Sequence, residues 1–191
     1  MSRSLFPSAS LIAALALSGA SPARAGDTIW PAERYSVRTS HSDIKAGGAR
    51  IDVHAPADAV QKLVLDFGHY ADHIKKFEKA RVVGRHGDST DVYLEVPIMK
   101  GAAKIWGIVR FEPARTGPSG ETLVSGTLVR GNVKRMDAWW RITRVDDHKT
   151  DLHLELLIVP DLPIPGSLVT GEAAYASEMA IKGIWKTAEG G

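Results

Sequence analysis

Residues 136–159, MDAWWRITRVDDHKTDLHLELLIV, decide the fold of this chain. Apolar and polar residues alternate in both halves of this stretch, and the pair Asp146-Asp147 stands between the halves. Alternation with period two is typical of strands with one buried face, and a short polar turn joins antiparallel neighbours. The stretch therefore predicts a hairpin of two strands, at 136–143 and 151–159.

Working outward, the same alternation recurs in four earlier segments that are separated by turn residues such as Gly87-Asp88 and Gly131-Asn132. Together with the hairpin they predict an antiparallel meander of six strands. A seventh strand, at 50–54, stops at Ala55-Pro56, where proline suits the first turn of a helix. The four segments before the hairpin are residues 81–85, 91–96, 104–111 and 122–130.

Helical periodicity appears between the first strand and the meander, and again at the end of the chain. Apolar residues spaced at i, i+3, i+4 and i+7 over 60–67 predict a short helix, and a second short stripe follows over 70–77. The proline-rich segment 160–166 then leads into a long helix expected at 167–186. The fold class is therefore α+β, with one antiparallel sheet and a long C-terminal helix.

The first 25 residues have a different composition from the rest. Arg3 supplies a positive start, 11–17 an apolar run, and Ala23-Arg24-Ala25 a small-x-small cleavage site. This pattern predicts a signal peptide at 1–25, cleaved after Ala25, and hence a periplasmic or secreted protein. Residues 26–42 are predicted as an N-terminal extension containing a short edge strand at 35–39, and 43–188 as a single domain.

Charge and composition exclude several kinds of function. The chain has 24 Lys and Arg against 22 Asp and Glu, and removal of Arg3 and Arg24 with the signal peptide leaves 22 of each sign. A balanced surface without a long basic run argues against nucleic-acid binding. The chain has no cysteine, so disulfides and thiolate sites are excluded.

His69 and His73 have the spacing of a metal-binding pair, but no third ligand is indicated, so we expect no metal and no cofactor.

Several short motifs resemble the START-like, polyketide cyclase and coenzyme Q-binding superfamily. They are Ala55-Pro56, LDFGHY at 65–70, WRIT at 140–143 and LPIP at 162–165. The resemblance implies a helix-grip fold, in which a curved seven-stranded antiparallel sheet wraps around a long C-terminal helix and two short helices follow the first strand. Members of this superfamily include lipid carriers, cyclases, dehydrases and hormone receptors. After Tyr70 the family usually has proline and a large aromatic residue, where this chain has ADH, so the resemblance assigns no subfamily.

The final helix raises the question of a cavity. On a helical wheel its shared apolar face consists mostly of alanine. Such a face must either approach the sheet closely or leave volume behind, and empty volume costs about 24 cal/mol per Å³. Cores tolerate either arrangement, and the resemblance favours a cavity. The face consists of Val169, Ala173, Ala176, Ala180 and Ile184.

Strand parity predicts which side chains would line that cavity. The leucines of 151–159 and Trp140 are expected to point inward, and Trp139 outward. Both faces of 104–111 are partly apolar, so periodicity does not orient this strand. Two apolar connections, 97–99 and 162–164, are expected at a mouth. The predicted ligand contacts are Leu94, Val96, Met99, Trp106, Trp140, Ile142, Leu154, Leu156, Ala176 and Ala180.

Three functions are compatible with these patterns. We favour an exported, non-enzymatic carrier or binding protein for a hydrophobic small molecule such as a lipid, isoprenoid or quinone, acting as a monomer with transient membrane contact. An alternative is a cyclase or dehydrase in which Glu95, His153 or Glu155 exchanges protons, which requires one of them to face inward. No catalytic residue is assigned on this evidence. The third is a structural or interaction module with a filled core.

Overall fold

The computed structural model describes residues 32–40, 42–98, 101, 103–161 and 163–190. The predicted signal peptide and the predicted contact Met99 lie outside these residues. The described strands are β1 (Glu33–Thr39), β2 (Ser42–Val53), β3 (Lys79–His86), β4 (Ser89–Ile98), β5 (Ala103–Phe111), β6 (Arg115–Thr116), β7 (Thr122–Gly131), β8 (Val133–Arg144) and β9 (Thr150–Pro160). The helices are α1 (Ala57–Leu65), the 3-10 turn η1 (Phe67–His69), α2 (Tyr70–His73) and α3 (Gly166–Ala188).

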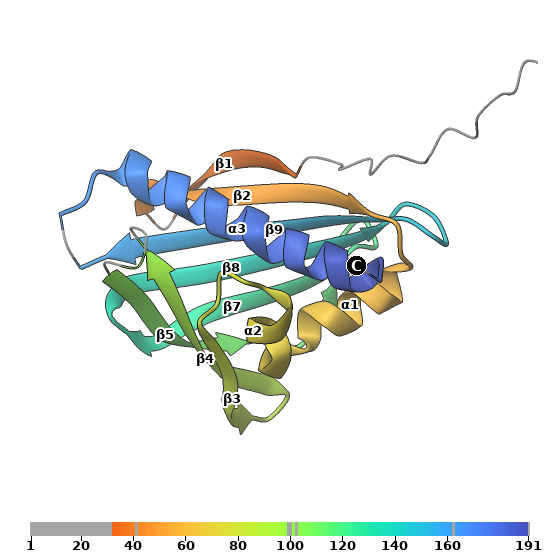
Figure 1. Ribbon diagram of the computed structural model, residues 1–191, viewed down its shortest axis with the longest axis horizontal. Coiled ribbons are helices and arrows are strands. Elements are labelled where there is room, and N and C mark those ends of the chain that lie inside the picture. Colours follow the sequence, from red (N-terminus) through yellow and green to blue (C-terminus); the bar gives the residue numbers. More distant parts are fainter. Residues whose placement is uncertain (1–31, 41, 99–100, 102, 162, 191) are drawn as a thin grey trace, which may run out of the picture.

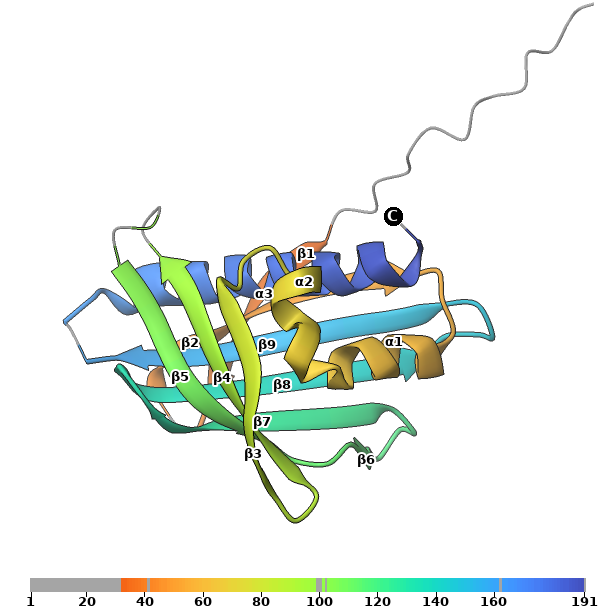
Figure 2. The same cartoon turned by 60° about the horizontal axis from the view of Figure 1, so that its bottom comes forward.

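All the strands belong to one antiparallel sheet, in the order β1-β2-β9-β8-β7-β5-β4-β3, with β6 paired to β7. Strands β7 to β9 are consecutive neighbours, as the meander predicts. The last strand of the meander, β9, lies beside the early strand β2, because β2 pairs with β9. The sheet is strongly curved, and β3, β4 and β5 run at a steep angle to the other long strands (Figure 2).

The predicted count of seven strands is wrong, because the described part of the sheet has nine. One of the additional strands, β6, consists of two residues, which are too few to show an alternating pattern. The other, β1, is an edge strand with a largely exposed face. It contains the short edge strand predicted at 35–39 in the N-terminal extension, which the count of seven did not include. The first half of β2 was not predicted as a strand, because the glycine and alanine residues at 46–49 have low strand propensity.

Helix α3 crosses the concave face of the sheet and packs against β2 and β9, while α1 and α2 cover one end of the same face (Figure 1). None of the helices within the described ranges is long and apolar enough to cross a membrane. The contact between α3 and β2 is very close at Gly47, where an added Cβ would lie 2.2 Å from the backbone nitrogen of Ala174. The Ser177 hydroxyl donates to the Gly47 carbonyl at 3.1 Å and fixes the helix at this point.

The β8–β9 hairpin has two chemically different surfaces. Trp140 pairs with Leu154, and one residue earlier Trp139 pairs with Glu155. Because successive side chains point to opposite faces of a sheet, the first pair faces α3 and the second faces away from it. We call these faces the inner surface and the outer surface.

Candidate ligand-binding site

A cavity of about 580 Å³ lies between the inner surface of the sheet and α3. Its walls come from β4, β5, β8 and β9, from α2 and the segment after it, and from α3 as far as Ala180. Apolar side chains make up nearly all of the interior. They include Phe77, Leu94, Val96, Ile105, Val109, Phe111, Val133, Met136, Trp140, Leu154, Leu156, Ile158, Val169, Ala176 and Ala180.

The alanine face of α3 meets the sheet in two different ways. Ala173 and Ala174 are buried against β2, where Gly47 permits close approach. Val169, Ala176 and Ala180 instead face the cavity, because the sheet curves away from the helix beyond β9. Small helix residues therefore allow close packing on β2 and leave space over β8.

Aromatic side chains close the inner end of the cavity. The Tyr70 ring lies edge-on to the Trp140 ring at 6.3 Å and stacks with Phe77 at 5.8 Å. The Tyr70 hydroxyl is fully buried and donates to the carbonyl oxygen of Val64. Burial raises the pKa of Tyr70 well above its ordinary value, so the hydroxyl stays protonated at neutral pH. Its proton is already donated, so a ligand in the cavity meets mainly ring carbons at this end.

Charged side chains are confined to the mouth of the cavity. The Lys104 ammonium lies 2.6 Å from Glu78 and 3.3 Å from Glu95, and the Lys76 ammonium lies 5.0 Å from the centre of the Tyr175 ring. Leu168 also borders the mouth and is 62% exposed. The remaining residues at this end are Ile98, Asn132, Asp161, Ile164 and Glu172.

No family model and no curated protein sequence matches the chain. Solved structures do match it. A STAR-related lipid transfer protein from Xanthomonas axonopodis is 15% identical with a TM-score of 0.69, over 83% of this chain and 94% of the other. A START superfamily protein from Mycobacterium smegmatis is 20% identical with a TM-score of 0.63, over 75% of this chain and 96% of the other. The chain has a START-like fold.

An enzyme structure is among these matches. The Zhui aromatase/cyclase from Streptomyces is 19% identical with a TM-score of 0.57, over 82% of this chain and 94% of the other. At these identities the likeness concerns the START-like fold alone. A shared fold does not determine function, which depends on the residues of the site.

Seven of the ten predicted contacts line the cavity of this START-like fold: Leu94, Val96, Trp140, Leu154, Leu156, Ala176 and Ala180. Met99 lies outside the described residues. Trp106 and Ile142 do not line the cavity, which corrects their expected position. Trp106 stacks on Tyr93 at 6.2 Å outside the cavity, because Ile105 and Gly107 take the inward positions on β5. Ile142 is buried at the end of β8 that α1 covers.

Several lining residues were absent from the sequence prediction, chiefly those of β5. Ile105, Val109 and Phe111 face the cavity, but their strand could not be oriented from its own pattern. The missing information is the pairing register, in which Ile105 lies opposite Val96 and Val109 opposite Val92. Paired residues share a face, so the clear alternation of β4 would have oriented β5 if the register had been known.

The proton-exchanging candidates of the enzymatic alternative lie away from the cavity. The Glu95 carboxylate accepts a hydrogen bond from Tyr93 at 2.6 Å and pairs with Lys79 at 3.2 Å. The Tyr93 hydrogen bond, followed by those of Lys79 and Lys104, lowers the pKa of Glu95 to about 2. A carboxylate with so low a pKa is a poor general base at neutral pH. His153 and Glu155 are on the outer surface, as their parity predicts.

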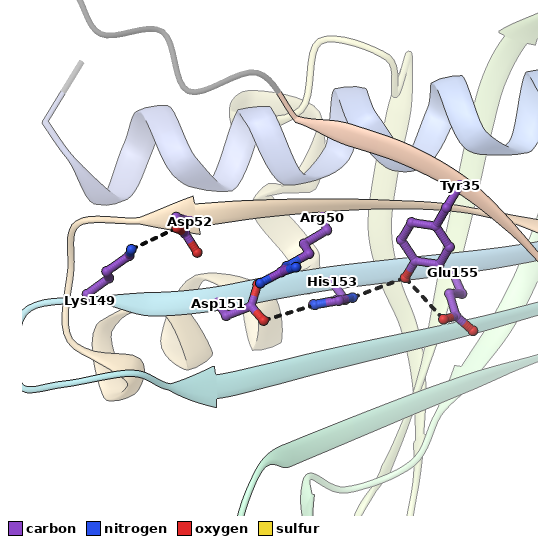
Figure 3. Close-up of polar contacts among 7 residues, drawn as sticks. All are labelled: Tyr35, Arg50, Asp52, Lys149, Asp151, His153 and Glu155. Atoms are coloured by element: carbon purple, nitrogen blue, oxygen red, sulfur yellow. Dashed lines mark hydrogen bonds and ion pairs between the residues drawn. The ribbon is translucent and has the colours of Figure 1, made fainter.

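On the outer surface, His153 and Glu155 belong to a chain of polar contacts (Figure 3). The Tyr35 hydroxyl donates to Glu155 at 3.1 Å and lies 3.1 Å from His153 Nδ1. His153 Nε2 lies 3.1 Å from Asp151, which also accepts from Arg50 at 2.9 Å. These contacts tie the edge strand β1 to β9.

The two histidines considered as a metal pair have other partners. His69 Nδ1 lies 2.7 Å from Asp66, and His73 Nδ1 lies 3.3 Å from the Thr187 hydroxyl. Within the ranges that the structure describes, no cluster of three metal-ligating side chains occurs.

Proposed function

We propose that this protein is an exported carrier or binding protein for a hydrophobic small molecule held between the sheet and α3. The observation that carries the proposal is the cavity of about 580 Å³ with an apolar interior and charges only at its mouth. Small-molecule sites in proteins typically measure roughly 300–1,000 Å³ and are lined mainly by apolar and aromatic side chains. A lipid transfer protein among the structural matches supports the same reading.

The interior chemistry favours a ligand with an apolar chain. The Tyr70 hydroxyl already donates to a backbone carbonyl, so it has no free proton for a ligand. Burying a polar ligand group without a hydrogen-bond partner costs about 1–3 kcal/mol on the scale of protein mutations. A lipid tail, an isoprenoid chain or the tail of a quinone avoids this cost. The polar end of such a ligand would lie at the mouth, beside Lys76 and Glu172.

A carrier fits the residues better than a cyclase or dehydrase does. Glu95, His153 and Glu155 are absent from the cavity lining, and each of them is held by other side chains. The exposed Leu168 at the mouth suits transient contact with a membrane, where a carrier would load and release its ligand. The signal-peptide pattern at 1–25 suits a periplasmic or secreted carrier.

Organic extraction of the purified mature protein, followed by mass spectrometry, tests this proposal. We expect an apolar molecule in stoichiometric amount, or saturable binding of at least one probe among farnesol, decylubiquinone and a fluorescent C16 fatty acid. Protein that contains no extractable molecule and binds none of these probes would contradict the proposal.

Filling the cavity gives a sharper test. Ala176→Trp or Ala180→Trp would place an indole in the ligand space and weaken probe binding by at least tenfold. Lys186→Trp is the matched control, because Lys186 is on the same helix but exposed and absent from the cavity lining. Circular dichroism establishes that each variant is folded. Unchanged binding in a folded Ala176→Trp variant would place the ligand elsewhere.

A further inference from the structure

A second concave site lies on the outer surface of β7, β8 and β9, with β8 and β9 between it and the apolar cavity. It is a groove of about 420 Å³, which we call the outer groove. One wall is the end of β1 with Ser40, and the other is formed by β6 and the outward residues of the long strands. Its lining includes Arg38, Thr39, Ser40, Arg115, Ser125, Trp139, Arg141, His153 and Glu155.

The pairing registers explain why basic side chains gather in this groove. Leu123 is the pairing partner of Arg115 on one side and of Arg141 on the other, so all three lie in one row across the outer surface. Neighbouring strands are about 4.8 Å apart, which separates the two arginine backbones by roughly two strand spacings. Arginine side chains are long enough to converge on one small ligand across that distance. Arg38 approaches from the opposite wall.

The charges of the outer groove are unbalanced. Three arginines line it against one carboxylate, that of Glu155. Glu155 already accepts a hydrogen bond from Tyr35. In the described part of the chain, Arg38, Arg115 and Arg141 make no ion pair and no side-chain hydrogen bond. Two other arginines of this sheet, Arg50 and Arg110, differ in that each is paired with an aspartate.

The wall that carries Arg38 and Thr39 is held in place by Tyr35. Its ring lies over Gly48, where an added Cβ would come within 2.6 Å of ring carbons. The missing side chain lets Tyr35 reach His153 and Glu155 on β9. Burial, followed by the neighbouring Glu155 carboxylate, raises the pKa of Tyr35, so the hydroxyl remains a donor at neutral pH. The outer groove therefore has two fixed walls.

We propose that the outer groove binds a small soluble oxyanion, a molecule that carries a phosphate or carboxylate group. Guanidinium groups recognise both anions through paired hydrogen bonds. Trp139 offers an aromatic surface for the organic part of the ligand. This site is separate from the cavity, and its occupant differs in chemistry from the apolar ligand of the proposed carrier.

Isothermal titration of the mature protein with phenyl phosphate and with benzoate tests the proposal. We expect saturable binding of at least one of the two probes, and the stronger one identifies the preferred anion. Arg115→Gln and Arg141→Gln should each weaken binding about tenfold, and the double variant should abolish it. Arg130→Gln is the matched control, since Arg130 is an exposed residue of β7 outside the groove.

Three results would overturn the proposal. One is the absence of saturable binding of either probe to the unaltered protein. Another is a folded double variant that binds as well as the control. Binding that requires phosphatidylglycerol vesicles and fails with both soluble probes would also overturn it, because the site is proposed for a soluble ligand. Farnesol binding by the double variant provides a separate check that the apolar cavity is intact.

Discussion

Trp139 and Trp140 are adjacent in the chain and lie on opposite surfaces of β8. Trp140 is 2% exposed and lines an apolar cavity, whereas Trp139 lines a groove that also contains three arginines. Strands β8 and β9 thus separate a space suited to hydrocarbon from a site suited to charge. Because side chains alternate along a strand, the two surfaces can differ completely in chemistry while sharing one backbone. We expect substitutions on the inner surface to act mainly on stability and apolar binding.

The largest contrast is expected between the two tryptophans themselves. Trp140→Ala removes a large buried side chain and should lower the free energy of unfolding by about 3–5 kcal/mol. Trp139→Ala removes a partly exposed one and should cost about 1 kcal/mol or less. Urea denaturation of both variants measures the difference. Similar losses would mean that the inner and outer surfaces contribute equally to the core.

Gly47→Ala tests the close approach of α3 to the inner surface. The added methyl group would meet the backbone of Thr170 and Ala174, which cannot move without moving the helix. We expect a loss of about 3 kcal/mol, at the upper end of the usual cost of overpacking. Gly171→Ala is the control on the same helix, because its Cβ would meet no atom within 4 Å. Higher helix propensity should make this control more stable by about 0.5–1 kcal/mol. Equal stability of Gly47→Ala and the unaltered protein would contradict the packing described above.

Asp151→Asn tests how the outer surface depends on pH. Burial alone would raise the pKa of Asp151, but hydrogen bonds from His153 and Arg50 outweigh it and lower the pKa. The charged carboxylate therefore stabilises the fold above the ordinary aspartate pKa, and this contribution is lost as the pH falls through the lowered value. At pH 7 the variant should be less stable by about 1–2 kcal/mol.

The pH profile provides the control for that prediction. Thermal melts between pH 7 and pH 2 should show the unaltered protein approaching the Asp151→Asn variant as the solution becomes acidic. A stability difference that stays constant over this range would show that ionisation of Asp151 contributes nothing.

The smallest effect is expected for Tyr35→Phe. The change removes the hydroxyl that contacts His153 and Glu155 but keeps the ring over Gly48. The expected loss is about 1 kcal/mol, the net value of a typical hydrogen bond. Binding of farnesol in the cavity should change by less than twofold. A large fall in apolar binding would show that the two surfaces are coupled through β9.

The hairpin, the long helix and the inward position of Trp140 could be predicted because each depends on a local pattern. Alternation in β8 and β9 identified their buried faces, and the spacing of alanines identified the face of α3 that meets the sheet. The orientation of β5 could not be obtained in this way, since Trp106 and Ile105 are both large and apolar. Only pairing with β4 places Ile105 in the cavity and Trp106 outside it.

Hydrophobic periodicity is a property of neighbouring residues, so the fold class, the order of the meander strands and the face that α3 turns to the sheet follow from local sequence. Tertiary structure alone decided where that face touches the sheet and where it leaves a cavity. It also brought Arg38, Arg115 and Arg141 to one groove from β1, β6 and β8. The proximity of these residues depends on strand register and sheet curvature, which arise from contacts between residues far apart in the chain.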